Sequence, residues 1–253
     1  MKTALRYLAL GLGVYLLSVL LTAPAAWLYG HGLKNRLGGV VLYGVQGTLW
    51  SGRAAALRAP AVALDELRWT LHPWALLWGR GEAALAFDYH QAPGTLVAAR
   101  SLSGDWYARD VDLELPAAQL MPMLRLPGAE LGGRLMLHLD SLTVKHGQVT
   151  AAEGALTWEK AALRQPLAVA LGTFAVTLHT TSEGVNGVLI DRGGAIQAQG
   201  VFKLHPDGAY QLTASFAARD AKLAPALRLF GAPGPDGRVS YSAAGHLPVP
   251  LSG

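Results

Sequence analysis

The side chains that could carry chemistry are eight histidines and a short run of alternating carboxylates. The histidines are His31, His72, His90, His138, His146, His179, His205 and His246. No two of them have the His-x-x-x-His spacing that puts two metal ligands on one helix face. Asp110, Asp112 and Glu114 share one face of a predicted strand, and such a row is typical of a face exposed to solvent. We therefore predict no metal site and no catalytic residues.

Other features exclude the common enzyme classes and nucleic-acid binding. The chain has no cysteine, so it has no thiolate nucleophile, no Cys-ligated metal and no disulfide. Ser51 lies in Trp50-Ser51-Gly52, which is not the Gly-x-Ser-x-Gly elbow of hydrolases, and no nucleotide-binding glycine motif occurs. The net charge of +4 comes from scattered basic residues, which argues against a nucleic-acid partner. We predict a protein that is not an enzyme and needs no cofactor.

The N-terminal residues predict a membrane anchor. Lys2 and Arg6 precede an uncharged run from Tyr7 to Leu28. A helix of this length measures about 33 Å, which is enough for a hydrocarbon core of about 30 Å. Trp27 and Tyr29 follow where interfacial aromatic residues are common. We predict a single-pass anchor in residues 1–29, with residues 30–253 in the periplasm of a bacterium.

A cleaved signal peptide is the alternative reading of this segment. Its apolar region would run from Tyr7 to Leu21, and Ala23-Pro24-Ala25 loosely fits the small-residue rule for cleavage. The apolar run continues to Leu28, however, which is long for a signal peptide. Both readings export the rest of the chain, and we favour the uncleaved anchor in the inner membrane.

Alternation of apolar and polar residues dominates the exported part. Apolar side chains at every second position predict strands with one apolar face. Such segments contain Leu67, Trp69 and Leu71; Ala83, Leu85, Phe87 and Tyr89; Val111, Leu113 and Leu115; Leu135, Leu137 and Leu139; Phe174, Val176 and Leu178; and Tyr210, Leu212 and Phe216. We predict a mainly β fold: a large curved antiparallel sheet, half-barrel-like, with a few short helices.

Turn residues separate these strands. His205-Pro206-Asp207-Gly208, Asn186-Gly187, Arg192-Gly193-Gly194 and the segment 233–237 all predict turns. Short helices are expected at 73–78, 116–124 and 223–230. A candidate junction between two halves of the sheet falls near 127–133.

Two ordered motifs carry a resemblance to a known family. The first is Gly47-Thr48-Leu49-Trp50-Ser51-Gly52. The second runs from Leu67 through Trp69 and Pro73 to Leu76 and Leu77. Together with the N-terminal anchor and Gly154-Ala155-Leu156-Thr157-Trp158, they resemble the type II secretion system protein N family. The family is also distantly similar to AsmA-like proteins, which have curved sheets that form lipid-accommodating grooves.

The resemblance implies a function and a set of motif residues. It implies an inner-membrane component of the machine that exports folded proteins across the outer membrane, with other secretion components as partners. The motif residues are Gly47, Thr48, Leu49, Trp50, Gly52, Leu67, Trp69, Pro73, Leu76 and Leu77, which we expect to be structural. The alternative function is a lipid-binding or lipid-transfer module whose apolar face holds phospholipid acyl chains.

Overall fold

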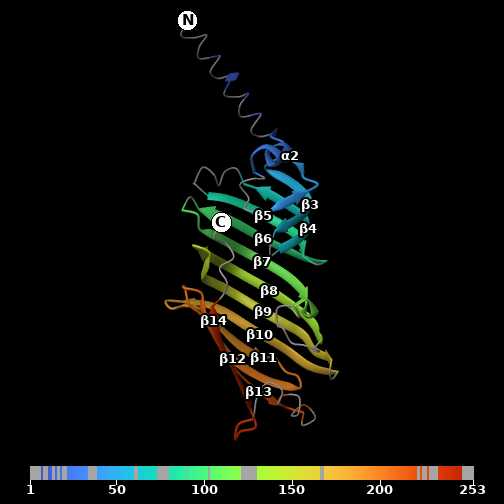
Figure 1. Ribbon diagram of the computed structural model, residues 1–253, viewed down its shortest axis with the longest axis vertical. Coiled ribbons are helices and arrows are strands. Elements are labelled where there is room, and N and C mark those ends of the chain that lie inside the picture. The colour runs from blue at the N-terminus through green and yellow to red at the C-terminus, as the bar shows by residue number, and fades with distance from the viewer. Residues whose placement is uncertain are drawn as a thin grey trace. The chain divides into compact units, whose positions relative to one another are not determined.

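The fold is mainly β. The structure is a computed structural model, and it describes residues 7, 11–12, 15, 18, 22–33, 39–59, 62–72, 80–89, 91–101, 103–120, 130–165, 168–220, 223, 227 and 233–246. These residues form fourteen strands and few helices (Figure 1). The chain divides into two compact units, Met1–Gln91 and Ala92–Gly253. The strand pairs inside each unit are antiparallel, which confirms the predicted class of fold.

The first unit contains five strands. They are β1 (Val41–Tyr43), β2 (Gln46–Gly47), β3 (Ser51–Ala59), β4 (Val62–Leu71) and β5 (Arg80–Tyr89). Their order in the sheet is β1-β3-β4-β5, and β2 also pairs with β3. The predicted alternation in β4 is confirmed, because Leu67 is buried opposite Ala54 while Glu66 and Arg68 are exposed.

The N-terminal segment changes direction before the predicted end of its helix. The described residues from Tyr7 to Thr22 are helical, but Pro24 is extended. Helix α2 (Ala25–Leu28) and one π-helical turn, η1 (Tyr29–Leu33), follow. The predicted continuous helix to Leu28 is therefore wrong at its end, because proline has no N–H to continue a helical ladder. Among the described residues, no helix combines the length and the apolar character that a bilayer crossing needs.

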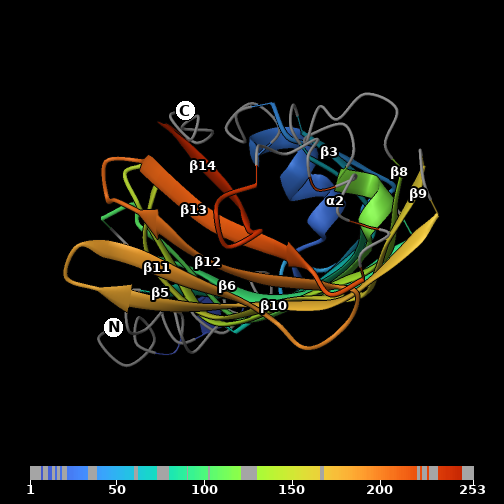
Figure 2. The same ribbon diagram turned by 90° about the horizontal axis from the view of Figure 1, so that it is seen from below.

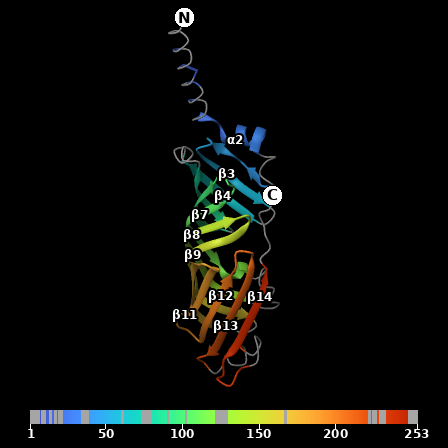
Figure 3. The same ribbon diagram turned by 90° about the vertical axis from the view of Figure 1, so that its left-hand side faces the viewer.

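The second unit contains nine strands joined in sequence order. They are β6 (Ala92–Ser101), β7 (Trp106–Pro116), β8 (Glu130–Lys145), β9 (Gln148–Gln165), β10 (Val169–Thr181), β11 (Gly184–Asp191), β12 (Ile196–Leu204), β13 (Ala209–Ala218) and β14 (Val239–His246). Each pairs with its sequence neighbour, and in the described part of the chain β6 and β14 do not pair. The sheet of this unit is therefore open. Figure 2 shows that it is curved, and Figure 3 shows β11 to β14 side by side.

One face of this curved sheet is apolar and only partly buried. A short 3-10 helix, η2 (Ala117–Leu120), packs through Ala117 against Leu131 and Leu135. A second cluster joins Ala152, Val185 and Leu204 from three strands. Val239 is the largest described side chain that is less than 2% exposed. Each cluster is therefore a small group of buried side chains from neighbouring elements.

The predicted turns are confirmed at 205–208, at 192–194 and at 233–237, and the turn predicted at Asn186-Gly187 is wrong. Between β12 and β13, the N–H of Gly208 donates to the carbonyl of His205 at 2.9 Å, as a tight turn requires. Asn186-Gly187 instead lies inside β11. Gly187 is there because the side chains of Leu178 and Phe202 occupy the space beside its Cα atom. Sheet packing, and not turn geometry, explains this glycine.

The predicted junction near 127–133 differs from the division that the structure shows. The two units meet between Gln91 and Ala92 in sequence. Residues 127–129 lie outside the described residues, and β8 runs without interruption through Gly132 and Gly133. Gly133 has a φ of +96° and lies against the backbone of Glu159 and Lys160, where no side chain fits. The glycine pair therefore marks an irregularity in β8.

Candidate functional site

The first motif forms a tight turn between β2 and β3. Gly47 has a φ of +87°, and a side chain there would meet the backbone oxygen of Ser51 at 2.6 Å. The N–H of Thr48 donates to the Ser51 carbonyl at 2.9 Å, and the Ser51 N–H donates to the Thr48 hydroxyl at 3.2 Å. The turn thus needs glycine at 47 and a short hydroxyl side chain at 48.

Trp69 from the second motif closes over this turn. Its indole Nε1 donates a hydrogen bond to the carbonyl of Leu49 at 3.1 Å. Its ring covers Gly52, the residue opposite it on β3, so closely that a Cβ atom on Gly52 would collide with the ring. The backbone carbonyl of Trp50 accepts a further hydrogen bond from the Leu71 N–H at 2.7 Å. The two motifs are therefore one packing unit.

Leu49 also connects this unit to the N-terminal segment. Its N–H donates to the carbonyl of Ala23 at 3.0 Å, while its own carbonyl accepts from Trp69. Next to this contact, Pro24 and Thr48 form an isolated antiparallel bridge. The end of the N-terminal helical segment is thus held on the sheet by backbone hydrogen bonds at the motif. We call these residues (Ala23, Pro24, Thr48, Leu49 and Trp69) the joint.

Trp27 and Tyr29, the predicted interface residues, differ in their environments. Trp27 is 59% exposed, and its ring stacks on His31 with 5.0 Å between centroids. The hydroxyl of Tyr29 instead accepts a hydrogen bond from the N–H of Leu42 in β1, at 2.8 Å. Trp27 therefore keeps most of its surface exposed, whereas Tyr29 adds a second tie between the segment and the sheet.

Of the other motif residues, one is buried and three lie outside the described residues. Leu67 is 6% exposed and belongs to the core of the first unit. Pro73, Leu76 and Leu77, with the helix predicted at 73–78, lie outside the described residues. The sequence interpretation did not identify Ala23 as part of the site. No local pattern points to it, because its role depends on a contact with a residue 26 positions away.

Three histidines pair with carboxylates, but the arrangement does not suggest catalysis. His138 lies between Asp112, at 2.6 Å, and Asp140, at 3.5 Å, on the exposed face of β7 and β8. The hydrogen bond and charge of Asp112 raise the pKa of His138 above its ordinary value. His179 similarly pairs with Glu153, and His72 lies 4.0 Å from Glu82. In the described part of the chain no group of three such side chains could hold a metal ion.

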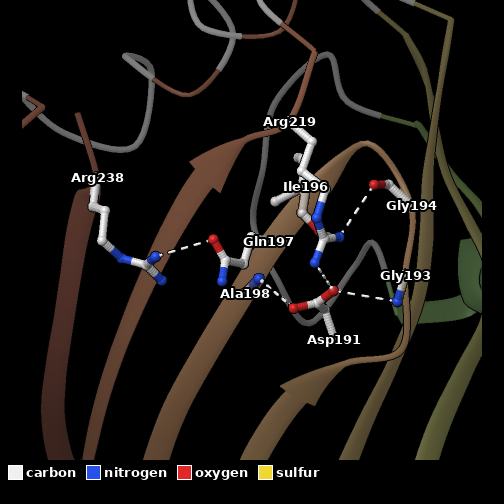
Figure 4. A network of polar contacts seen from close by, with 8 residues as sticks. All are labelled: Asp191, Gly193, Gly194, Ile196, Gln197, Ala198, Arg219 and Arg238. Atoms are coloured by element: carbon white, nitrogen blue, oxygen red, sulfur yellow. Dashed lines mark hydrogen bonds and ion pairs between the residues drawn. The ribbon is translucent and has the colours of Figure 1, made fainter. Parts of the chain in front are cut away.

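An ion pair fixes the turn between β11 and β12 in the second unit. Arg219 Nη2 lies 2.6 Å from Asp191 Oδ1, and the N–H groups of Gly193 and Ala198 also donate to this carboxylate (Figure 4). Arg219 Nη1 donates to the carbonyl of Gly194 at 3.2 Å. Burial raises the pKa of Asp191, but these hydrogen bonds outweigh it and hold the pKa below its ordinary value. The network is structural.

The fold and the joint define a class of protein: an open antiparallel sheet that follows a helical N-terminal segment and is tied to it at a Gly-Thr-Leu-Trp turn. A family model, "Type II secretion system (T2SS), protein N", matches residues 38–242. A Vibrio cholerae protein named type II secretion system protein N is 35% identical over 247 residues, which cover 92% of this chain and 96% of that protein. A protein of the same name from Aeromonas hydrophila is 31% identical over 216 residues, covering 83% of this chain and 84% of that protein.

These comparisons show the family. The chain belongs to the type II secretion system protein N family, as the two sequence motifs predicted. No solved structure matches it significantly.

Proposed function

We propose that this protein is a component of the type II secretion system, anchored in the bacterial inner membrane with its β units in the periplasm. The observation that carries the proposal is the family membership, which extends over nearly the whole chain. In this role it supports the export of folded proteins across the outer membrane. Its partners are then other components of the secretion system.

The joint supports the anchored arrangement. Tyr7, Leu12 and Tyr15 are helical and between 58% and 72% exposed, so the helical segment offers apolar side chains that its own chain does not cover. Hydrogen bonds from Leu49 and to Tyr29 then hold the end of this segment against β1 and the β2–β3 turn. A flexible tether would need none of these contacts. We infer that the joint sets the first sheet unit at a defined place next to the membrane.

We also propose a structural and not a catalytic role. In the described residues no polar or charged residue is buried. The histidines that contact carboxylates, such as His138 and His179, lie on exposed strand faces and form ion pairs there. Catalytic groups are usually held in a concave site that excludes water. A scaffold role requires only surfaces that partners contact.

Fractionation and protease digestion test the location. The protein should separate with the inner membrane, and spheroplasts treated with protease should lose residues 30–253 while intact cells should not. The mature protein should retain Met1 or Lys2 at its N-terminus. A soluble periplasmic protein that begins near Ala25 would show that the segment is a cleaved signal peptide.

Lipid binding stays a prediction and is the second candidate. The half-buried apolar face of the second unit favours it, because side chains such as Phe202, Trp158 and Phe174 keep part of their surface exposed in the described structure. Nothing in the comparisons supports an AsmA-like relationship. Photo-crosslinking from position 202 to phospholipid would favour this alternative, and a lipid-free preparation without crosslinks would exclude it.

A further inference from the structure

The last strand, β14, presents an open edge without the protection that edge strands usually have. It spans eight residues, Val239–His246, and pairs with β13 in one continuous register from Val239↔Phe216 to His246↔Ala209. On its other side, an isolated bridge joins Val239 to Pro233. In the described part of the chain nothing pairs with Ser240 to His246 on that side. A row of free backbone groups is a template for another strand.

The sequence of β14 lacks the features that usually prevent an edge strand from pairing with another strand. Charged side chains, proline, bulges or a very short strand normally block edge pairing. The segment Val239–His246 reads Val-Ser-Tyr-Ser-Ala-Ala-Gly-His and has none of them. Its side chains are small on one face, at Ser240, Ser242 and Ala244. A second strand can therefore approach closely along Ser240–His246, beyond the bridge from Pro233 to Val239.

The edge strand of the first unit shows the contrast. β1 has only three residues, Val41–Tyr43, and the hydroxyl of Tyr29 accepts a hydrogen bond from its Leu42 N–H. That edge is short and partly occupied. Of these two edges, only that of β14 is long and without a paired strand in the described part of the chain.

We propose that β14 pairs with β14 of a second copy of this chain, antiparallel, across a two-fold axis. Like strands that carry charges would repel each other in such a pair. β14 contains no Lys, Arg, Asp or Glu, so two copies of it would not repel each other. Pairing about Ala243 also places Ser242 opposite Ala244 and Tyr241 opposite Gly245, so a small residue faces each larger one.

The pair of Tyr241 and Gly245 repeats a contact inside the chain. Tyr210 is opposite Gly245 in the β13–β14 pair, and its ring atoms lie 3.0 Å from where a Cβ atom of Gly245 would be. Tyr241 is 41% exposed. In the dimer its ring would lie beside Gly245 and Tyr210 of the second copy, which covers its apolar surface. An aromatic side chain across from glycine is a recognised stabilising pair in sheets.

Two measurements on the full chain in mild detergent test the dimer. Light scattering should give twice the monomer mass of 26.6 kDa for the protein component. Ala244→Lys should reduce this to the monomer, because a lysine on an edge strand blocks pairing. Gln211→Lys on β13, directly opposite Ala244 and equally exposed, should leave the dimer intact. A wild-type monomer, or a dimer that survives Ala244→Lys, would overturn the proposal.

Cysteine crosslinking gives an independent readout that does not depend on how Ala244→Lys folds. The chain has no cysteine, so a single Ala243→Cys substitution allows a disulfide only between copies. Facing residues of antiparallel strands have Cα atoms about 4.5–5.5 Å apart, which is within disulfide range. Ala243→Cys should crosslink on mild oxidation and Gln211→Cys should not. Equal crosslinking of both, or of neither, would contradict the β14 pairing.

Discussion

The indole Nε1 of Trp69 donates to the carbonyl of Leu49 at 3.1 Å, while the N–H of Leu49 donates to Ala23 at 3.0 Å. One residue of the family motif therefore connects a core tryptophan of the first sheet to the end of the N-terminal segment. Loss of this connection should reduce stability and also loosen the segment.

Replacing Trp69 should destabilise the protein, and replacement by alanine should cost more stability than replacement by phenylalanine. Trp69→Phe loses the hydrogen bond to Leu49 and should cost about 1 kcal/mol. Trp69→Ala also loses the packing over Gly52 and should cost about 3 kcal/mol. Trp106→Ala is the control, because Trp106 is 43% exposed and should cost less. Thermal unfolding followed by circular dichroism measures all three. Equal losses at positions 69 and 106 would contradict the role of Trp69 in the joint.

Gly52 should not tolerate a side chain. In Gly52→Ala the Cβ atom would collide with the Trp69 ring and lie 2.7 Å from the Gln46 carbonyl oxygen. Such overpacking typically costs about 1–3 kcal/mol. Gly81→Ala, in strand β5, is the matched control because nothing lies within 4 Å of its Cβ position. The melting temperature should fall for the first variant and not for the second. No difference between them would mean that Trp69 does not cover Gly52.

Removing the hydroxyl of Tyr29 should free one amide of β1. In Tyr29→Phe the N–H of Leu42 loses its acceptor at 2.8 Å, and about 1 kcal/mol of protection is lost. Hydrogen exchange at Leu42 should then accelerate about fivefold, while exchange in β4 should not change. Tyr43→Phe is the control because Tyr43 is 55% exposed. Unaltered exchange at Leu42 in Tyr29→Phe would argue against this tie.

The Asp191 network should stabilise the second unit in a pH-dependent way. Because the folded-state pKa of Asp191 lies below its ordinary value, its contribution is complete above about pH 4 and is lost as the pH falls below it. Asp191→Asn should therefore cost about 2 kcal/mol at pH 7. The difference from wild type should shrink in acid.

Asp65→Asn is the control for this variant. Asp65 forms an ion pair with Arg58 in which both side chains are about half exposed, and such pairs contribute little. Melting temperatures of the two variants and wild type between neutral and acid pH give the comparison. An Asp191→Asn difference that stays constant down to strong acid would show that the charge of Asp191 is not what stabilises the turn.

The period-2 patterns predicted the strands well because the fold leaves one face of each sheet apolar. In β8, Leu135 and Leu139 are buried while Arg134, Met136 and His138 are exposed. The acidic row was also interpreted correctly, since Asp112 is exposed in β7, where it pairs with His138. Local periodicity carries this information without any knowledge of neighbouring strands.

Features that depend on distant contacts could not be predicted. The attachment of Ala23 and Pro24 to the sheet depends on Leu49 and Thr48. The space beside Gly187 is filled by Leu178 and Phe202 from neighbouring strands. Asn186-Gly187 looks like a turn dipeptide, but the turn lies at Ser182 and Glu183. The resemblance identified Trp69 and Gly52 as motif residues, and only the structure shows that the two are in contact.

Secretion in a strain that lacks this gene tests whether the protein is needed for type II secretion. The measurement is the fraction of a type II substrate that reaches the culture medium, compared with the fraction retained in the periplasm. If the protein is a component of the secretion system, the substrate should accumulate in the periplasm of the deletion strain, and the full chain should restore its release. Trp69→Ala should restore it poorly and Trp106→Ala should restore it well. Normal release from the deletion strain, with no effect of adding the chain back, would contradict a role in type II secretion.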